Sequence, residues 1–183
     1  MYGAARVAMV LALGVGLASC ASSPPMRFYT LSGVGGEGAS ASAQPAIRVA
    51  RVTLPGEVDR AELVQRIDAN RLRLAEEDRW AAPLAEMVRR ALTDDLRSRV
   101  PAASGEPDTL SVDIEEFIAD ANCSVSLRAA WTLTRAGANQ PATHGYEAIR
   151  TDASGACTVG AIPEAMSRAL AELSNRIASA RSR

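Results

Sequence analysis

Apolar side chains recur with a helical period in two segments of the chain. In residues 84–96 they stand three or four positions apart, and Pro83 occupies a position that is favoured at a helix start. Pro163 opens a second segment of the same kind, which extends to Ile177. The sequence therefore predicts two amphipathic helices. Their apolar stripes are Leu84, Met87, Val88, Ala91, Leu92 and Leu96 in the first, and Met166, Leu170, Leu173 and Ile177 in the second.

Other segments alternate apolar and polar residues with the period of two that is typical of strands. Residues 47–52 alternate and stop at Leu54-Pro55, and residues 63–65 and 71–75 flank Asp68-Ala69-Asn70, a sequence that favours a hairpin turn. A short strand is also expected at residues 27–31, within a segment rich in Ala, Ser, Gly and Pro.

Three more alternating runs follow the first helix. They start near Leu110, Val125 and Gly145, and their order along the chain predicts an antiparallel meander. The first run changes phase at Phe117-Ile118, which marks either a bulge or the end of the strand. Together these elements predict an α+β fold in which one mostly antiparallel sheet has two amphipathic helices packed on one face.

The first twenty residues have the build of a bacterial lipoprotein signal. Arg6 precedes an apolar run of about 12 residues, which is too short to span a bilayer, and the segment ends in Leu17-Ala18-Ser19-Cys20, a lipobox. We expect cleavage before Cys20 and acylation of its sulfur. Two or three acyl chains hold a protein on a membrane almost irreversibly. An ordinary secretory signal, or a soluble protein with an apolar first strand, is the alternative.

These boundaries divide the chain into three parts. Residues 1–19 are the expected signal peptide, residues 20–46 an acylated flexible tether with a short strand, and residues 47–183 a single α+β domain. Removing 19 residues from 183 leaves 164, which suits one domain. The formal net charge is −1 and both signs are interspersed, which argues against nucleic acid as a partner.

Three cysteines are present, and Cys20 is assigned to the lipid. Cys123 and Cys157 remain as a pair in a compartment that permits disulfides, so we expect a bridge between them, with two separate buried thiols as the alternative. His144 is the only histidine and no paired CxxC motif is present, so neither a metal site nor a cofactor is expected. A nucleophile with a base beside it is also missing from the sequence, so we expect no catalytic residues and no enzyme.

Residues 54–96 contain three motifs in a fixed order. They are Leu54-Pro55 followed by Asp59-Arg60, then Val64, Arg66, Asn70 and Leu72, then Asp78-Arg79-Trp80 followed by Pro83-Leu84. With these motifs, residues 54–96 resemble the signature stretch of the PqiC/YmbA-type ABC-transport auxiliary lipoproteins. The lipobox, Tyr29-Thr30-Leu31 and residues 165–170 of the last helix add to the resemblance, which covers nearly the whole mature chain. At residues 56–58 the chain departs from the aromatic and leucine that family members often have.

The resemblance implies a function. Such a protein would be a non-catalytic lipoprotein of an intermembrane lipid transport system, with an ABC permease and ATPase in the inner membrane and an MCE-domain protein across the periplasm. Ala21 after the acylated cysteine points to the outer membrane, with the protein on its periplasmic face. Family resemblance also suggests a ring of identical subunits.

The candidate partner-binding residues are Asp59, Arg60, Arg79 and Trp80, because Trp and Arg are typical of binding hot spots. From the residues alone, Trp80 could instead cap the core while Arg79 forms a surface ion pair. Two other functions stay open at this point, a lipid-binding periplasmic carrier and a structural envelope lipoprotein.

Overall fold

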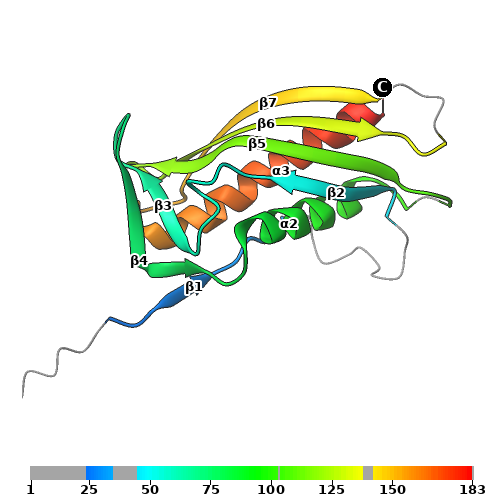
Figure 1. The fold of residues 1–183 in the computed structure, drawn as a ribbon. Coiled ribbons are helices and arrows are strands. Elements are labelled where there is room, and N and C mark those ends of the chain that lie inside the picture. Colours follow the sequence, from blue (N-terminus) through cyan, green and yellow to red (C-terminus); the bar gives the residue numbers. More distant parts are fainter. Residues whose placement is uncertain (1–23, 35–44, 103, 138–141, 183) are drawn as a thin grey trace, which may run out of the picture.

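The computed structural model describes residues 24–34, 45–102, 104–137 and 142–182. The expected signal peptide, the lipobox with Cys20, and residues 35–44 of the expected tether lie outside the described residues. Figure 1 shows the described elements as one sheet with two long helices against it.

Seven strands form a single mixed sheet. They lie in the order β1-β4-β3-β5-β6-β7, and β2 also pairs with β5. The α+β class is confirmed. Three pairings are antiparallel and three are parallel, and the two longest pairings, β5–β6 and β6–β7, are antiparallel. The strands are β1 Arg27–Tyr29, β2 Ile47–Thr53, β3 Glu62–Arg66, β4 Leu72–Trp80, β5 Asp108–Asp120, β6 Ser124–Thr134 and β7 Thr143–Asp152.

The parallel pairings arise because two strands share one side of β5. β2 pairs with its first half, and β3 pairs with its last residues, Ala119 and Asp120. The other side of β5 pairs along its length with β6, which in turn pairs with β7, as the predicted meander requires. Residues 54–61 connect β2 to β3 and run past the part of β5 that neither strand reaches.

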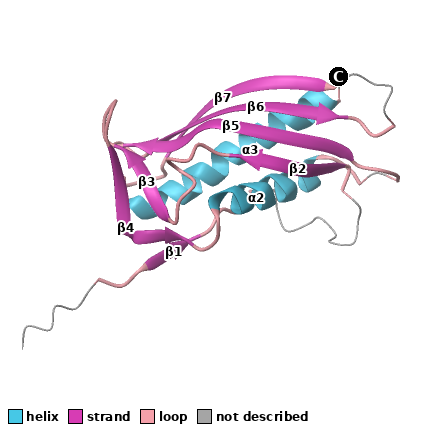
Figure 2. Ribbon diagram, viewed as in Figure 1, coloured by secondary structure: helices cyan, strands magenta, loops and turns pink. Residues whose placement is uncertain are grey.

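Two helices cover one face of the sheet, as Figure 2 shows. α2 Leu84–Arg99 follows Pro83 directly and ends at Val100, before Pro101, and α3 Ile162–Arg181 has Pro163 in its first turn. A short 3-10 helix, η1 Val159–Ala161, precedes α3. All ten residues of the two predicted apolar stripes are buried, and they pack against the sheet in one continuous core.

The phase change predicted in β5 is a bulge, and the strand continues to Asp120. The register with β6 shifts between Ile114 and Glu116, so one extra residue is inserted. Phe117 then enters the main core, whereas Ile118 on the opposite face joins a small second cluster with Val58 and Val64. Residues 54–61 therefore cover the otherwise open face at this point.

Residues 27–32, within the segment that the sequence assigned to a tether with a short strand, pack against the folded body. β1 pairs in parallel with the end of β4, and Leu31 is buried in the main core. The backbone N–H of Ser32 also donates to the hydroxyl of Ser167 on α3, at 3.2 Å. The short strand expected within this segment is therefore present as β1. Tyr29 and Leu31 hold it in place, because both pack against the main core.

Cys123 and Cys157 form a disulfide in the structure. Their Cα atoms are 5.4 Å apart, and the bond joins the β5–β6 turn to the segment before η1. Cys123 has a φ of 60°, in the left-handed region. The Asp120 carboxylate holds this turn, because it accepts from the backbone N–H groups of Asn122 at 2.8 Å and Ser124 at 3.0 Å.

Candidate functional site

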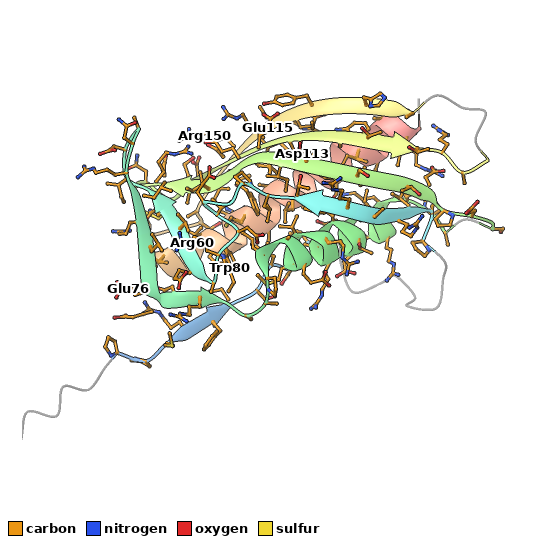
Figure 3. The ribbon with its side chains drawn as sticks, in the orientation of Figure 1. Arg60, Glu76, Trp80, Asp113, Glu115 and Arg150 are labelled. Carbon is orange, nitrogen blue, oxygen red and sulfur yellow. A yellow bond between two sulfur atoms is a disulfide. The ribbon has the colours of Figure 1, made fainter. Side chains whose placement is uncertain are left out.

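The candidate site lies at the corner of the sheet where β1, β4 and the 54–61 connection meet. Pro55 starts a turn in this connection, because its carbonyl accepts from the N–H groups of Val58 at 3.0 Å and Asp59 at 3.1 Å. Val58 is buried, and the turn leaves Asp59 and Arg60 exposed. The sequence-predicted pair Asp59-Arg60 is therefore on the surface. In Figure 3, Arg60 lies in front of the helices and Glu76 on the outer bend of β4.

Arg60 and Arg79, two of the predicted site residues, lie near the same carboxylate, that of Glu62. Glu62 Oε2 is 3.9 Å from Arg60 Nε, and Glu62 Oε1 is 3.6 Å from an Arg79 terminal nitrogen. Among the described residues, the buried Arg79 Nε has no hydrogen-bond partner. Two guanidiniums thus face one carboxylate at ion-pair distance rather than in close bidentate contact. This arrangement, the Arg60–Glu62–Arg79 cluster, leaves N–H groups on two partly exposed guanidiniums for an additional carboxylate or phosphate, whereas the buried Arg79 Nε is out of a partner's reach.

Trp80 does not belong to this surface. Its side chain is 6% exposed and packs in the main core, next to the start of α2. Its backbone N–H donates to the carbonyl of Ala61 at 2.8 Å, which ties the end of β4 to the start of β3. The expectation that Trp80 contacts a partner is corrected on this ground: a side chain enclosed by the core has no area to offer another protein.

A bend in β4 explains the placement of Trp80. Glu62 pairs with Arg79 but the next residue, Leu63, pairs with Ala75, so residues 76–78 have no partner in β3. The last residues of β4 turn away toward β1. Beyond the bend, Asp78 and Trp80 face the helices, and Arg79 faces the opposite side.

Asp78 fixes β1 to the sheet. Arg27 donates to both of its carboxylate oxygens, at 2.7 and 2.8 Å, and the Tyr29 hydroxyl donates to it at 2.9 Å. The Arg27 hydrogen bonds hold the pKa of the Asp78 carboxyl below its usual range. Burial, followed by the hydrogen bond to Asp78, raises the pKa of Tyr29. Sequence reasoning missed this role of Asp78, although Asp78 is part of the family motif.

Phe28 was also missed and is the most exposed large apolar side chain in the described part of the chain, at 63%. It stands opposite Arg79 in the β1–β4 pair, on the face away from Asp78. The sequence does contain a signal for this exposure. If residues 27–29 form a strand, the side chain of Phe28 points to the opposite face from those of Arg27 and Tyr29.

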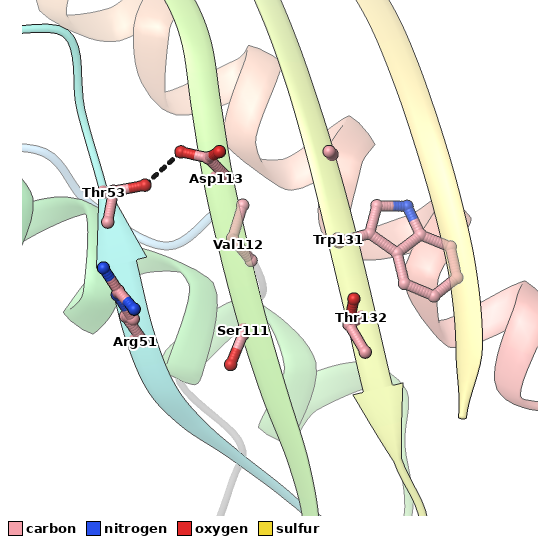
Figure 4. Close-up of a pocket in the computed structure, with 8 residues that line it drawn as sticks. Arg51, Thr53, Ser111, Val112, Asp113, Trp131 and Thr132 are labelled. Atoms are coloured by element: carbon pink, nitrogen blue, oxygen red, sulfur yellow. Dashed lines mark hydrogen bonds between the residues drawn. The ribbon is translucent and has the colours of Figure 1, made fainter. Parts of the chain in front are cut away.

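The open face of the sheet has a shallow hollow of about 540 Å³, shown in Figure 4. Thr53 donates a hydrogen bond to Asp113 at its rim, and Arg51 lies beside them on β2. The floor is formed by small and polar residues of β5 and β6. The lining residues are Arg51, Thr53, Ser111, Val112, Asp113, Ala130, Trp131 and Thr132.

Catalytic or metal-binding groups do not gather in the described residues. No group of three or more His, Cys, Asp or Glu side chains there could hold a metal ion. His144 is on the open face, where its Nδ1 is 3.0 Å from the Thr132 hydroxyl. Neither helix of the described part has the length and hydropathy needed to cross a membrane. Cys20, the predicted lipidation site, lies outside the described residues.

Comparison with known proteins gives a family and a fold. The family model described as "ABC-type transport auxiliary lipoprotein component" matches residues 29–178. The crystal structure of an uncharacterized protein aligns with a TM-score of 0.69 at 16% identity, over 85% of this chain and 98% of the other. A Xanthomonas campestris crystal structure aligns with a TM-score of 0.54 at 12% identity, over 82% and 92%. A search of curated proteins finds no match.

Proposed function

The chain belongs to the family of ABC-type transport auxiliary lipoproteins, and we propose that it is the outer-membrane lipoprotein of an MCE-type lipid transport system. In this role it docks the periplasmic MCE-domain protein, which is linked to an ABC permease and ATPase in the inner membrane. It binds protein and performs no catalysis.

The Arg60–Glu62–Arg79 cluster is the observation that supports docking. Arg60 and Arg79 side chains are 49% and 38% exposed, and the carboxylate of Glu62 is shared between the two guanidiniums at 3.9 and 3.6 Å. Arginines with free donors bind carboxylates in a fixed bidentate geometry. The partner surface that fits this cluster presents an aspartate or glutamate. Asp59 beside it would select against a partner with a second acidic group nearby.

The position of the cluster relative to the anchor is consistent with this role. Arg27 is seven positions after Cys20, and a chain of that length reaches at most about 25 Å. β1 is paired with β4, the strand that contains Arg79. A partner bound at the cluster would therefore be held close to the membrane in which the acyl chains of Cys20 are inserted.

The lipid-carrier alternative receives less support from the described residues. The 540 Å³ hollow lies on the open face of the sheet, and Arg51, Thr53 and Asp113 line it. An acyl chain placed there would desolvate a guanidinium and a carboxylate without replacing their hydrogen bonds, which is unfavourable. The helix-covered face is filled by the side chains of the main core.

The test is affinity purification of the lipidated protein from membranes after mild crosslinking. Wild type should recover an MCE-domain protein, and the double variant Arg60→Ala/Arg79→Ala should recover at least several-fold less. Arg90→Ala is the matched control, because Arg90 is an exposed arginine that pairs with one glutamate, Glu86, on α2. Recovery that is equal in all three proteins would exclude the cluster. Failure of wild type to recover any MCE-domain protein would overturn the docking function.

A further inference from the structure

The edge strand β1 presents an unusual apolar surface. Phe28 is 63% exposed, and Met26, two residues before it, is 48% exposed. Single exposed apolar side chains are common on protein surfaces, but exposed apolar side chains that lie next to one another mark contact with a partner or a membrane. The other exposed large apolar side chains in the described residues are Val34, Leu72, Leu74 and Tyr146.

The structure holds Phe28 firmly in this exposed position. On one side of it Arg27 binds Asp78 through two hydrogen bonds. On the other side the Tyr29 carbonyl accepts from the N–H of Ala81 at 2.8 Å. These contacts fix the backbone of β1, and the register with Arg79 keeps Phe28 on the face away from the core. Little backbone conformational freedom therefore remains to be lost when Phe28 meets another surface.

The short stretch of chain between Cys20, the expected lipid anchor, and Phe28 indicates which surface Phe28 meets. Met26 is six positions after Cys20, and Phe28 is eight positions after it. Even fully extended, these lengths reach at most about 22 and 29 Å. An exposed apolar pair so close to an acylated residue is within reach of the bilayer that receives the acyl chains.

We propose that Phe28 and Met26 insert into the interface of the membrane that holds the anchor, so that β1 rests on the phospholipid surface. This rests on the proposed lipidation of Cys20. The contact sets the orientation of the body, because a flexible lipid anchor alone would let it rotate freely. It also places the Arg60–Glu62–Arg79 cluster beside the membrane, since Arg79 is paired with Phe28.

Charge around β1 indicates a zwitterionic lipid surface. Arg27 pairs with Asp78 and approaches Glu77 at 3.8 Å, while Glu62 faces Arg60 and Arg79. Three guanidiniums thus balance three carboxylates, and Glu76 and Asp59 add exposed negative charge at the same corner. No net positive charge is available to attract anionic lipids, so insertion depends on apolar contact.

The experiment uses the full lipidated protein reconstituted in phosphatidylethanolamine/phosphatidylcholine vesicles with brominated acyl chains, which quench tryptophan emission on contact. Phe28→Trp and Met26→Trp each add a reporter, and wild type supplies the background of Trp80 and Trp131. Tyr146→Trp is the matched control, because Tyr146 is a 55% exposed aromatic residue on β7, at the opposite edge of the sheet.

The expected result is a blue-shifted emission and strong quenching of the added tryptophan at residues 28 and 26, with neither effect at residue 146. Equal quenching at residues 28 and 146, or none at either, overturns the membrane contact. Flotation of Cys20→Ser with the vesicles tests the anchor separately. If that variant stays bound like wild type, the lipid anchor is wrong, while quenching at residue 28 would still support the contact.

Discussion

Gly145 lies directly opposite Trp131 in the β6–β7 pair, and the Trp131 indole occupies the space that a side chain at residue 145 would need. A Cβ built on Gly145 would overlap two ring carbons and the ring nitrogen of Trp131. Trp131 is 4% exposed and belongs to the main core, so the ring cannot move aside without displacing its packed neighbours. Glycine at residue 145 is required by packing, not by backbone conformation.

Gly145→Ala should therefore destabilise the protein by about 1–3 kcal/mol, the usual cost of overpacking a core. Urea unfolding monitored by circular dichroism measures this difference. Gly56→Ala is the control, because nothing lies within 4 Å of a Cβ at Gly56, and its stability should stay within about 0.5 kcal/mol of wild type. Equal stability of the two variants would show that the indole moves aside easily.

Local periodicity was sufficient to predict most elements of the fold. Both helices and the β5–β6–β7 meander follow from apolar spacing between neighbours in the sequence, and the structure confirms them. The three residues of β1 are too few to show a period, and their partners on β4 are 51 positions away. The parallel pairings of β2 and β3 with β5 are equally non-local. These pairings join strands that are distant in the sequence. Hydrophobic periodicity describes only neighbouring residues, so it does not predict them.

The candidate site was predictable only in part. Sequence reasoning placed Arg60 and Asp59 on a surface, and they are exposed. It could not place Trp80, because the bend at residues 76–78 decides which side of β4 meets the helices. The same bend turns Asp78 toward Arg27. In the motif Asp78-Arg79-Trp80, Asp78 therefore binds β1, Arg79 lies at the surface and Trp80 packs in the core.

Trp80→Ala should destabilise the protein by about 3–5 kcal/mol, because it leaves a large cavity in the core. Trp80→Phe keeps most of the apolar volume, and we expect a smaller loss of stability with partner recovery unchanged. Urea unfolding and the crosslinking purification measure the two effects. A Trp80→Phe variant that is as stable as wild type but recovers no MCE-domain protein would show that Trp80 contacts the partner directly.

Asp78→Asn should weaken the attachment of β1 at neutral pH. A carboxylate that accepts charged hydrogen bonds contributes about 1.5–3 kcal/mol, and asparagine keeps the shape without the charge. Because Arg27 lowers the pKa of Asp78 in the folded state, this stability is present above the unfolded pKa, about 3.9, and is lost as the pH falls through the lower folded pKa.

The stability difference between wild type and Asp78→Asn should thus be largest near pH 7 and should shrink below about pH 4. Chemical unfolding at a series of pH values measures it. Asp94→Asn is the control, because Asp94 is an exposed carboxylate on α2, and we expect little change at any pH. A difference for Asp78→Asn that stays constant down to pH 2 would mean that the charge of the carboxylate has no part in holding β1.

Loss of the Cys123–Cys157 disulfide should lower stability without unfolding the protein. The bridge spans 34 positions, and in the chain-entropy model a loop of that length contributes about 3–4 kcal/mol. The double variant Cys123→Ala/Cys157→Ala, compared with oxidised and reduced wild type in urea, measures the contribution. The variant and the reduced protein should agree, because both release the same constraint on the unfolded chain. If oxidised wild type is no more stable than the double variant, the α3 and β5–β6 contacts alone fix the turn at Cys123.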